Sequence, residues 1–319
     1  EKSDWREYLD EALLFYAALL RAITRYEKAL LICQDTNAAN HWLKSVHIPA
    51  DRLRIFECET NDTWARDFGF LSVEDNGKTL LMNFEFNGWG LKFAANHDNQ
   101  INARLDESGI FAPAAMQKNN WILEGGSVES DGKGTIMTTS NCLFAPNRNN
   151  AIDRAFFEDV FRRDLGANRI VWIENGHLEN DDTDAHIDTL ARFCDDETIA
   201  FVVCDDKRDT HYEPLAKMKE EILALKRTDG SSYRFVELPM VAPLYYENDR
   251  LPASYANFLI INQAVIAPIY GVHTDRKALD MLQRAFPNRV IVPIRSEVVV
   301  RQHGSVHCLT MQIPATIGF

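Results

Sequence analysis

The chain has 319 residues, 46% of them hydrophobic and 25% charged, which is typical of a globular protein with a sizeable buried core. Its formal net charge of −13 argues against nucleic acid and anionic membrane surfaces as partners, because both would repel it. The charge suits a small cationic substrate, although a solvated acidic surface is the simpler explanation.

The sequence predicts neither a membrane span nor secretion. It contains no run of eighteen apolar residues and no signal-peptide pattern. The cysteines are scattered, without a Cys-x-x-Cys pair, and several stand in apolar runs. We therefore expect reduced thiols in a cytoplasmic protein. The six are Cys33, Cys58, Cys142, Cys194, Cys204 and Cys308.

The first half of the chain predicts a helix followed by short strands. Ser3-Asp4 is typical of a helix start, and apolar residues at helical spacing predict a helix over 5–27. Asp75-Asn-Gly77 is typical of a hairpin turn. A polar segment over 96–108 is expected to be helical. The expected strands cover 29–34, 52–58, 67–74, 78–86, 120–128 and 134–144.

The second half repeats this pattern. Helices are expected over 151–165, 214–227 and 275–286. Units of a helix followed by strands recur at a spacing of about 60 residues, and no low-complexity linker divides them. We therefore expect one α/β domain over 1–319, built from repeated αβ units. Its further strands are expected over 169–174, 198–204, 233–238, 257–262, 264–270 and 289–294, and from 297 towards Cys308.

Cys308 is the cysteine whose surroundings suggest a nucleophile. It follows His303-Gly-Ser-Val-His307, a polar turn, whereas a buried cysteine usually acts as a small hydrophobic residue. Imidazoles and turn N–H groups next to a thiol lower its pKa and create thiolate. The five other cysteines lack such imidazole-rich surroundings in the sequence.

The segment Asn180–Asp188 places four carboxylates and His186 within nine residues. On an extended chain, His186 and Asp188 would point to the same face. A calcium loop of the EF-hand type is excluded, because His186 stands where that loop needs glycine and Arg192 where it needs glutamate. A zinc site would need a third ligand that the sequence does not mark. A structural hydrogen bond between His186 and Asp188 remains the simpler alternative.

Three further motifs combine a charge or an aromatic ring with a turn. Trp64-Ala-Arg66-Asp67 places a charge pair beside an indole, which a surface ion pair also explains. Glu124 ends an apolar strand and precedes two glycines, as a strand end and a turn would require. Trp89 stands in a turn, where hairpin packing is the simpler interpretation.

In their order, these motifs resemble those of the agmatine deiminases, in the group that includes the bacterial peptidylarginine deiminases and belongs to the guanidino-group modifying superfamily. The resemblance extends over most of the chain. The sequence departs from the family pattern at Phe70 and Asn150, where proline is usual, and at Glu129, where histidine is usual. Family members also have an apolar strand before the position of Glu1, so the first repeat is expected to be incomplete. The motifs are Thr63-Trp64-x-Arg66-Asp67-x-Gly69, Phe86-Asn87-x-Trp89-Gly90, Leu123-Glu124-Gly125-Gly126, Asp131-Gly132-x-Gly134-Thr135, Asn147-Arg148-Asn149, Asp182-Thr183-Asp184-x-His186-Ile187-Asp188, Ala191-Arg192-Phe193, Leu251-Pro252-x-Ser254-Tyr255-x-Asn257-Phe258 and His307-Cys308-x-Thr310-x-Gln312.

The resemblance implies a five-bladed α/β propeller, the pentein fold, with the active site in a central channel. It implies that Cys308 attacks the guanidinium carbon and that Asp67 and Asp188 bind the guanidinium nitrogens. His186 would act as acid and then as base, with Glu124 orienting His186 or the substrate. The substrate-binding residues implied are Trp64, Trp89, Asp67, Asp188 and Asp184.

The implied reaction is hydrolysis of agmatine to N-carbamoylputrescine and ammonia, a step of putrescine biosynthesis, with water as the second substrate. No metal and no organic cofactor is expected, and a homodimer is left open. Two alternatives remain at this point. One is a deiminase acting on arginine in peptides or on free arginine, and the other is a non-catalytic cation-binding protein. The second has no use for Cys308.

Overall fold

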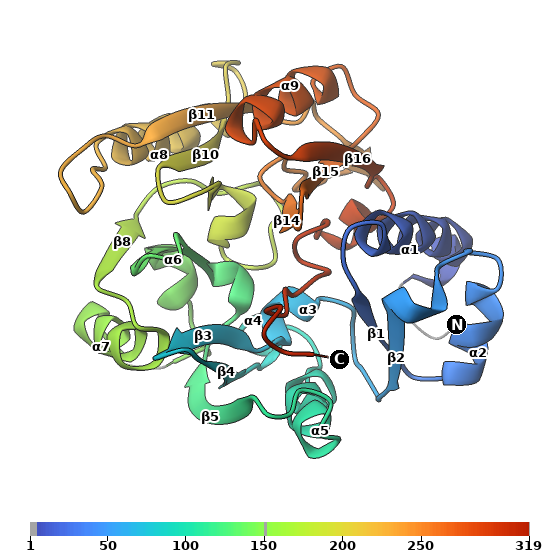
Figure 1. Ribbon diagram of the computed structural model, residues 1–319. Helices are drawn as coiled ribbons and strands as arrows, with labels where there is room; N and C mark the ends of the chain where they lie inside the picture. Colours follow the sequence, from blue (N-terminus) through green and yellow to red (C-terminus); the bar gives the residue numbers. More distant parts are fainter. Residues whose placement is uncertain (1–4, 150–151, 319) are drawn as a thin grey trace.

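The computed structural model describes residues 5–149 and 152–318. Within these ranges, five small sheets surround a common centre, and each contains a pair of parallel strands (Figure 1). The chain enters each unit in turn, so that neighbouring sheets are neighbours in the sequence. The C-terminal segment runs back into the centre of the ring (Figure 1).

The sheets differ only in the number of their strands. The first, β1–β2, has two parallel strands, and each of the others has an antiparallel pair followed by a parallel partner. A separate hairpin is formed by β12 (Tyr245–Tyr246) and β13 (Asp249–Arg250). The strands are β1 (Ala29–Cys33) and β2 (Leu53–Glu57); β3 (Leu71–Asp75), β4 (Lys78–Glu85) and β5 (Ala115–Ile122); β6 (Val128–Ser130), β7 (Thr135–Thr139) and β8 (Arg169–Ile173); β9 (Ala191–Phe193), β10 (Thr198–Val203) and β11 (Arg234–Pro239); β14 (Leu259–Ile261), β15 (Ala264–Ile269) and β16 (Val290–Arg295).

Each parallel pair is joined through a helix, because parallel strands need a crossover long enough to return the chain to the same end of the sheet. The crossover helices are α2 (Thr36–Leu43), α5 (Ile101–Glu107), α7 (Arg154–Leu165), α8 (Tyr212–Leu223) and α9 (Asp275–Ala285). The remaining helices are α1 (Leu9–Thr24), α3 (Ala65–Phe68), α4 (Gly88–Leu91) and α6 (Ser140–Leu143). The repeated unit is therefore two strands, a helix and a strand.

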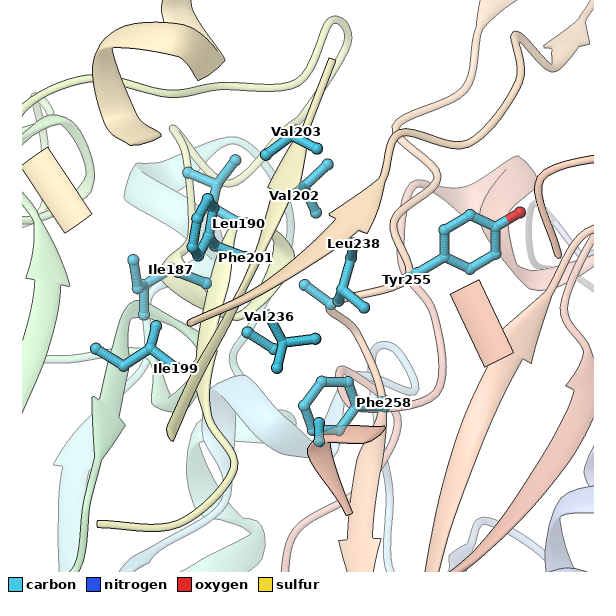
Figure 2. Close-up of a cluster of buried hydrophobic side chains, with 14 of the residues drawn as sticks. Ile187, Leu190, Ile199, Phe201, Val202, Val203, Val236, Leu238, Tyr255 and Phe258 are labelled. Carbon is cyan, nitrogen blue, oxygen red and sulfur yellow. The ribbon is translucent and has the colours of Figure 1, made fainter. Parts of the chain in front are cut away.

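The core of the fourth unit anchors one part of the site. All six residues of β10 are buried, as expected for a strand covered on both faces. Ile187 and Leu190 pack with Phe201 in this cluster (Figure 2). Ile187 lies between His186 and Asp188 in the chain, so its burial holds these two polar residues at the inner end of the unit.

The expected α/β propeller and most of the expected elements are confirmed. The strands predicted from apolar runs agree best with the structure. The strands expected over 29–34, 52–58, 78–86, 169–174, 198–204, 233–238, 264–270 and 289–294 form as β1, β2, β4, β8, β10, β11, β15 and β16, and the helices expected over 5–27, 96–108, 214–227 and 275–286 correspond to α1, α5, α8 and α9. The first sheet has two strands in the described ranges, one fewer than each of the other four. Residues 3–4 and residue 151, where two helices were expected to begin, lie outside the described residues.

Four expectations were wrong in detail, all near the site. The strand expected from 297 is a 3-10 helix over Val299–Gln302, after which His303 adopts a φ of 66° and turns the chain. Residues 67–74 begin as α3, and the strand starts only at Leu71. The strands expected over 120–128 and 134–144 are interrupted by a 3-10 helix over Gly125–Ser127 and by α6. The expected strands end early where polar side chains face the centre of the ring. In addition, α2 and β9 were not predicted from the sequence.

None of the helices in the described parts of the chain is long and apolar enough to span a membrane.

Candidate active site

The candidate site lies at the centre of the ring of sheets, where several units contribute equivalent positions. Asp67, Glu124, Asp188 and Asn257 each lie a few residues before the first strand of their own unit, namely β3, β6, β9 and β14. Cys308 follows the last unit. The repeated architecture therefore brings residues from five segments to one point, although they are far apart in the sequence.

Asp67 is buried and faces away from its neighbour Arg66. Its Oδ2 accepts a hydrogen bond from Trp89 Nε1 over 3.0 Å, and its Oδ1 accepts one from the backbone N–H of Gly126 over 3.0 Å. The Arg66 guanidinium instead donates to the Gln312 side chain and contacts Met311 Sδ at 3.2 Å. The alternative of an Arg66–Asp67 ion pair is therefore wrong, because a helical turn sends the two side chains to opposite sides.

Glu124 connects His186 to a buried arginine. Its Oε2 lies 3.0 Å from His186 Nε2, and Arg148 Nε donates to both of its oxygens at 3.0 and 2.9 Å. Burial alone would raise the pKa of Glu124, but the hydrogen bond from His186 and the charge of Arg148 lower it. Glu124 is therefore an ionised acceptor that orients the His186 ring.

Asp188 and Cys308 meet on the other side of this centre. Asp188 Oδ2 accepts from His307 Nδ1 over 2.7 Å and from Asn257 Nδ2 over 3.3 Å, and it lies 3.7 Å from Cys308 Sγ. Asn257 Nδ2 also donates to Cys308 Sγ over 3.1 Å. Asp188 lies in a 3-10 helix over Ile187–Thr189 and not on an extended chain, but it and His186 still face the same centre.

The protonation state of His186 follows from its anionic surroundings. Burial lowers its pKa, but Asp67, Cys142 and Glu124 outweigh this and raise the pKa well above the ordinary value. We conclude that the ring carries both protons at neutral pH. Gly126 makes this approach possible, because a Cβ atom there would lie 2.5 Å from His186 Nδ1 and 2.8 Å from Asp67 Oδ1.

Cys308 is a thiol and not a thiolate in this arrangement. Burial raises its pKa well above the ordinary value, and the negative charges of Asp188 and Asp67 raise it further. The expectation that neighbouring imidazoles lower this pKa is wrong, because neither ring is placed to do so. His303 Nδ1 faces Asp182 Oδ2 at 2.9 Å, and His307 lies between Asp188 and Arg192.

Two buried polar atoms at this centre have no hydrogen-bond partner among the described residues. They are Asp188 Oδ1 and His186 Nδ1. Asp188 Oδ1 accepts hydrogen bonds, and His186 Nδ1 in the doubly protonated ring donates one. His186 Nδ1 lies 3.6 Å from Asp67 Oδ1, too far for a normal hydrogen bond. Buried polar groups are nearly always paired, so these two atoms mark where a polar ligand would bind.

Comparison with known proteins agrees with this geometry. Residues 1–314 match the family model described as the Porphyromonas-type peptidyl-arginine deiminase. The chain belongs to this family. It is 29% identical to an agmatine deiminase of Pseudomonas aeruginosa strain LESB58 over 336 aligned positions, covering 98% of this chain and 90% of the relative.

Two solved structures of the family superpose closely. A candidate arginine deiminase of Porphyromonas gingivalis has 44% identity and a TM-score of 0.94, with 100% of this chain and 94% of that one covered. A cysteine-to-serine variant of the C. jejuni agmatine deiminase with substrate bound has 40% identity and a TM-score of 0.89, with 97% and 89% covered. The expected resemblance and the pentein type of α/β fold are thereby confirmed.

The aromatic and acidic residues expected to contact substrate, Trp89, Trp64 and Asp184, are each held by neighbouring groups. Trp89 is fixed by its hydrogen bond to Asp67 and packs edge-to-face on Phe86. Trp64 covers Gly304, where an added Cβ would lie 2.2 Å from the indole. Asp184 Oδ2 accepts from Arg148 Nη1 and Lys92 Nζ, at 2.6 and 2.8 Å, so this carboxylate is largely neutralised.

The site also contains three neighbouring side chains of the kinds that can bind a metal ion. Among the described residues, Glu124, Cys142 and His186 place ligand atoms within 4.8 Å of one another. A metal ion does not fit there, because Arg148 occupies both oxygens of Glu124 and would repel it. The expectation that the five other cysteines have no imidazole nearby is wrong for Cys142, which lies beside His186. Its thiol lies 3.7 Å from Glu124 Oε2 and interacts with His186, and burial raises its pKa.

Sequence reasoning did not assign a role to Asn257, Arg148 or Arg192, and it gave His307 only the role of activating the thiol, which the structure does not support. Asn257, Arg148 and Arg192 stand inside motifs that carried the family resemblance, and His307 directly precedes the expected nucleophile. That placement was a signal, but it did not say which atoms they contact. Their side-chain contacts join segments up to 119 residues apart, which no local pattern encodes.

Proposed function

We propose that the protein is an agmatine deiminase, which hydrolyses agmatine to N-carbamoylputrescine and ammonia. The observation that carries this proposal is the buried thiol of Cys308 beside the unpartnered Asp188 Oδ1 and His186 Nδ1. A guanidinium is a planar cation whose N–H groups suit ionised carboxylates. The agmatine deiminases among its relatives support the choice of substrate.

In the binding step, Asp188 and Asp67 hold the guanidinium nitrogens, and the aliphatic stem runs between Trp64 and Trp89. Asp184 remains a candidate substrate contact through Oδ1, because its Oδ2 is already bound by two cations. The bound cation offsets the carboxylates that raise the pKa of Cys308. The thiol therefore loses its proton when substrate is present, which restricts the reactive thiolate to the complex.

In the first chemical step, Cys308 Sγ forms a bond to the guanidinium carbon, and a tetrahedral adduct results. His186 donates a proton to one –NH2 group, and the C–N bond breaks to release ammonia. A cationic amidino thioether remains on Cys308. The raised pKa of His186 supports this role, since the ring must be protonated before it can act as an acid.

In the second step, water adds to the same carbon while neutral His186 takes one of its protons. The adduct then collapses, the C–S bond breaks, and the hydroxyl proton returns to sulfur as the ureido group forms. The proton that the thiol first released leaves with ammonia as ammonium. Glu124 keeps the His186 ring oriented through both steps, because its ionised carboxylate accepts from Nε2.

No metal enters this mechanism, and dialysis against a chelator is expected to leave the activity unchanged. All six cysteines are free thiols, which suits a reducing compartment, so we place the enzyme in the cytoplasm. We propose that the chain forms one catalytic domain and that its product is a precursor of putrescine.

The experiment compares ureido product formed from agmatine, free arginine and a blocked arginine peptide under identical conditions. Agmatine is expected to give the largest kcat/KM. A larger value for the blocked peptide would replace the proposal with a peptidylarginine deiminase. Cys308→Ser is expected to lose turnover but still bind agmatine, measured by thermal shift, because the carboxylates remain. Cys204→Ser, at a half-buried cysteine that directly follows β10, is the matched control and should keep full activity.

A further inference from the structure

Behind Asp188, a line of buried side chains leads away from the proposed reaction centre. Asp188 Oδ2 lies 2.7 Å from His307 Nδ1, and His307 Nε2 lies 2.9 Å from Arg192 Nη2. Arg192 Nε in turn lies 2.8 Å from Glu129 Oε2. The exposed fraction of each of these four residues is 8% or less. The groups come from two different units and from the C-terminal segment.

The chemistry of arginine fixes the protonation of His307. A guanidinium only donates hydrogen bonds, so the Nε2 atom facing Arg192 must be the acceptor. The proton of the neutral ring is then on Nδ1 and points at Asp188. A second proton on Nε2 would oppose the Arg192 N–H. The other charged groups facing His307 are Arg66 and His186, and burial together with these three cations holds its pKa well below the ordinary value.

Arg192 is itself immobilised. Its Nη1 donates to the backbone carbonyls of Ala256 and Phe258 at 3.1 and 2.7 Å, and its guanidinium stacks 4.7 Å from the centre of the Phe258 ring. Glu129 supplies the opposite charge, and its second oxygen accepts from the backbone N–H of Phe193. The buried cation is therefore paired and hydrogen-bonded, as a charge in a low-dielectric interior must be.

We propose that His307 is a positioning residue for the deimination, held by Arg192 and Glu129 as a neutral Nδ1–H donor that favours the ionised form of Asp188 and turns its free oxygen towards the guanidinium. This inference rests on the proposed function. The hydrogen bond to Oδ2 favours the carboxylate over the carboxylic acid, which burial would otherwise favour. It also leaves Oδ1 as the oxygen available to substrate.

The kinetic test uses the acidic limb of the pH profile of kcat/KM, which reports ionisation of the free enzyme. The groups facing Asp188 are His307, Asn257, His186, Asp67, Arg192, Arg66 and the thiol of Cys308. His307→Phe removes the N–H donor, so the acidic limb is expected to move up by about one pH unit. Activity that is lost at pH 7 should then return in part towards pH 9. A profile with the same midpoint as the intact enzyme would overturn the proposal.

Glu129→Gln keeps the shape of the side chain and one of its two hydrogen bonds, because the amide NH2 cannot accept from Arg192 Nε or from the Phe193 N–H. It also removes one negative charge, so that Arg192 acts more strongly on Asp188. The acidic limb is then expected to move down, opposite to His307→Phe, and this variant serves if His307→Phe fails to fold. A shift of the limb upwards would contradict the proposal. Arg250→Met is the control, because it breaks a two-bond ion pair with Asp209 elsewhere in the fold. It should lower the melting temperature without moving the limb.

A second readout does not depend on turnover. Nitrogen-15 NMR of labelled histidine should find His307 in the neutral Nδ1–H form from pH 5 to pH 9, and titrating in Arg192→Met. Titration of His307 near pH 6.5 in the intact protein would overturn the inference. If instead agmatine is not hydrolysed while His307 behaves as stated, the proposed function fails and the buried arrangement stands.

Discussion

The Asn257 side chain contacts Cys308 with both ends of its amide. Nδ2 donates to Cys308 Sγ over 3.1 Å, and Oδ1 accepts from the Cys308 backbone N–H over 3.3 Å. Oδ1 also accepts from the backbone N–H of His307 over 2.9 Å. One side chain therefore fixes the turn that carries the thiol and provides an N–H to stabilise negative charge on sulfur.

Asn257→Leu should lower kcat by roughly 10²-fold, because it removes a fixed donor to a developing anion in a buried site. The rate of thiol alkylation in the absence of substrate should fall as well. Asn175→Leu, at an amide outside the site that bonds to Glu221, is the control. Equal kcat for Asn257→Leu and the intact enzyme would show that Asn257 only shapes the turn.

Gly126→Ala should inactivate the enzyme through crowding. The new Cβ would lie 2.5 Å from His186 Nδ1 and 3.2 Å from Asp188 Oδ2, so both groups must move. A displacement of this kind costs roughly 10²-fold in rate, and overpacking lowers the free energy of unfolding by about 1–3 kcal/mol. Activity and urea unfolding measure the two effects. Gly318→Ala, where a Cβ meets nothing within 4 Å, should change neither.

Asp188→Asn should abolish turnover and change how stability depends on pH. Burial raises the pKa of Asp188 to about 7, well above the unfolded value of about 3.9. Because the folded pKa is the higher one, the stability contributed by this group is present below about pH 4 and is lost as pH rises through 7.

The free energy of unfolding of the intact protein should therefore decline relative to Asp188→Asn by about 1 kcal/mol per pH unit between pH 5 and 7. Above that range the difference should level off. Urea denaturation of both proteins at pH 5, 6, 7 and 8 provides the test. A difference that does not vary with pH would mean that Asp188 is ionised throughout.

A haloacetamidine, a planar cation with a leaving group, should label Cys308 before any other cysteine. The carboxylates around the site concentrate a cation, so labelling should be faster than with neutral iodoacetamide. Cys142 is fully buried and its pKa is raised, so it should remain unmodified despite its polar neighbours. Excess agmatine should protect, and Cys308→Ser should lose the rapid phase. Mass spectrometry that finds the first label on Cys142 or Cys204 would refute the assignment.

The reliability of the sequence-based predictions varied along the chain for a physical reason. Strands such as Thr198–Val203 were predictable, because a strand covered on both faces reads as a continuous apolar run. Segments near the centre were not, because polar side chains that face inward break the hydrophobic pattern. The stretch from 297 to Cys308 is the clearest case: its apolar start suggested a strand, whereas it is a 3-10 helix and a turn.

The sequence by itself determined the α/β repeat and, through its ordered motifs, the residues that come together: Asp67, Glu124, His186, Asp188 and Cys308. Only the tertiary structure decided what each of them contacts. It turned Arg66 away from Asp67, placed Cys142 against His186, and separated His303 and His307 from the thiol that they were expected to activate. Helical and strand periodicity report which side of an element is buried. The hydrogen-bond partner of a buried polar group instead depends on how separate units pack around the centre. The pKa of that group depends on the same packing.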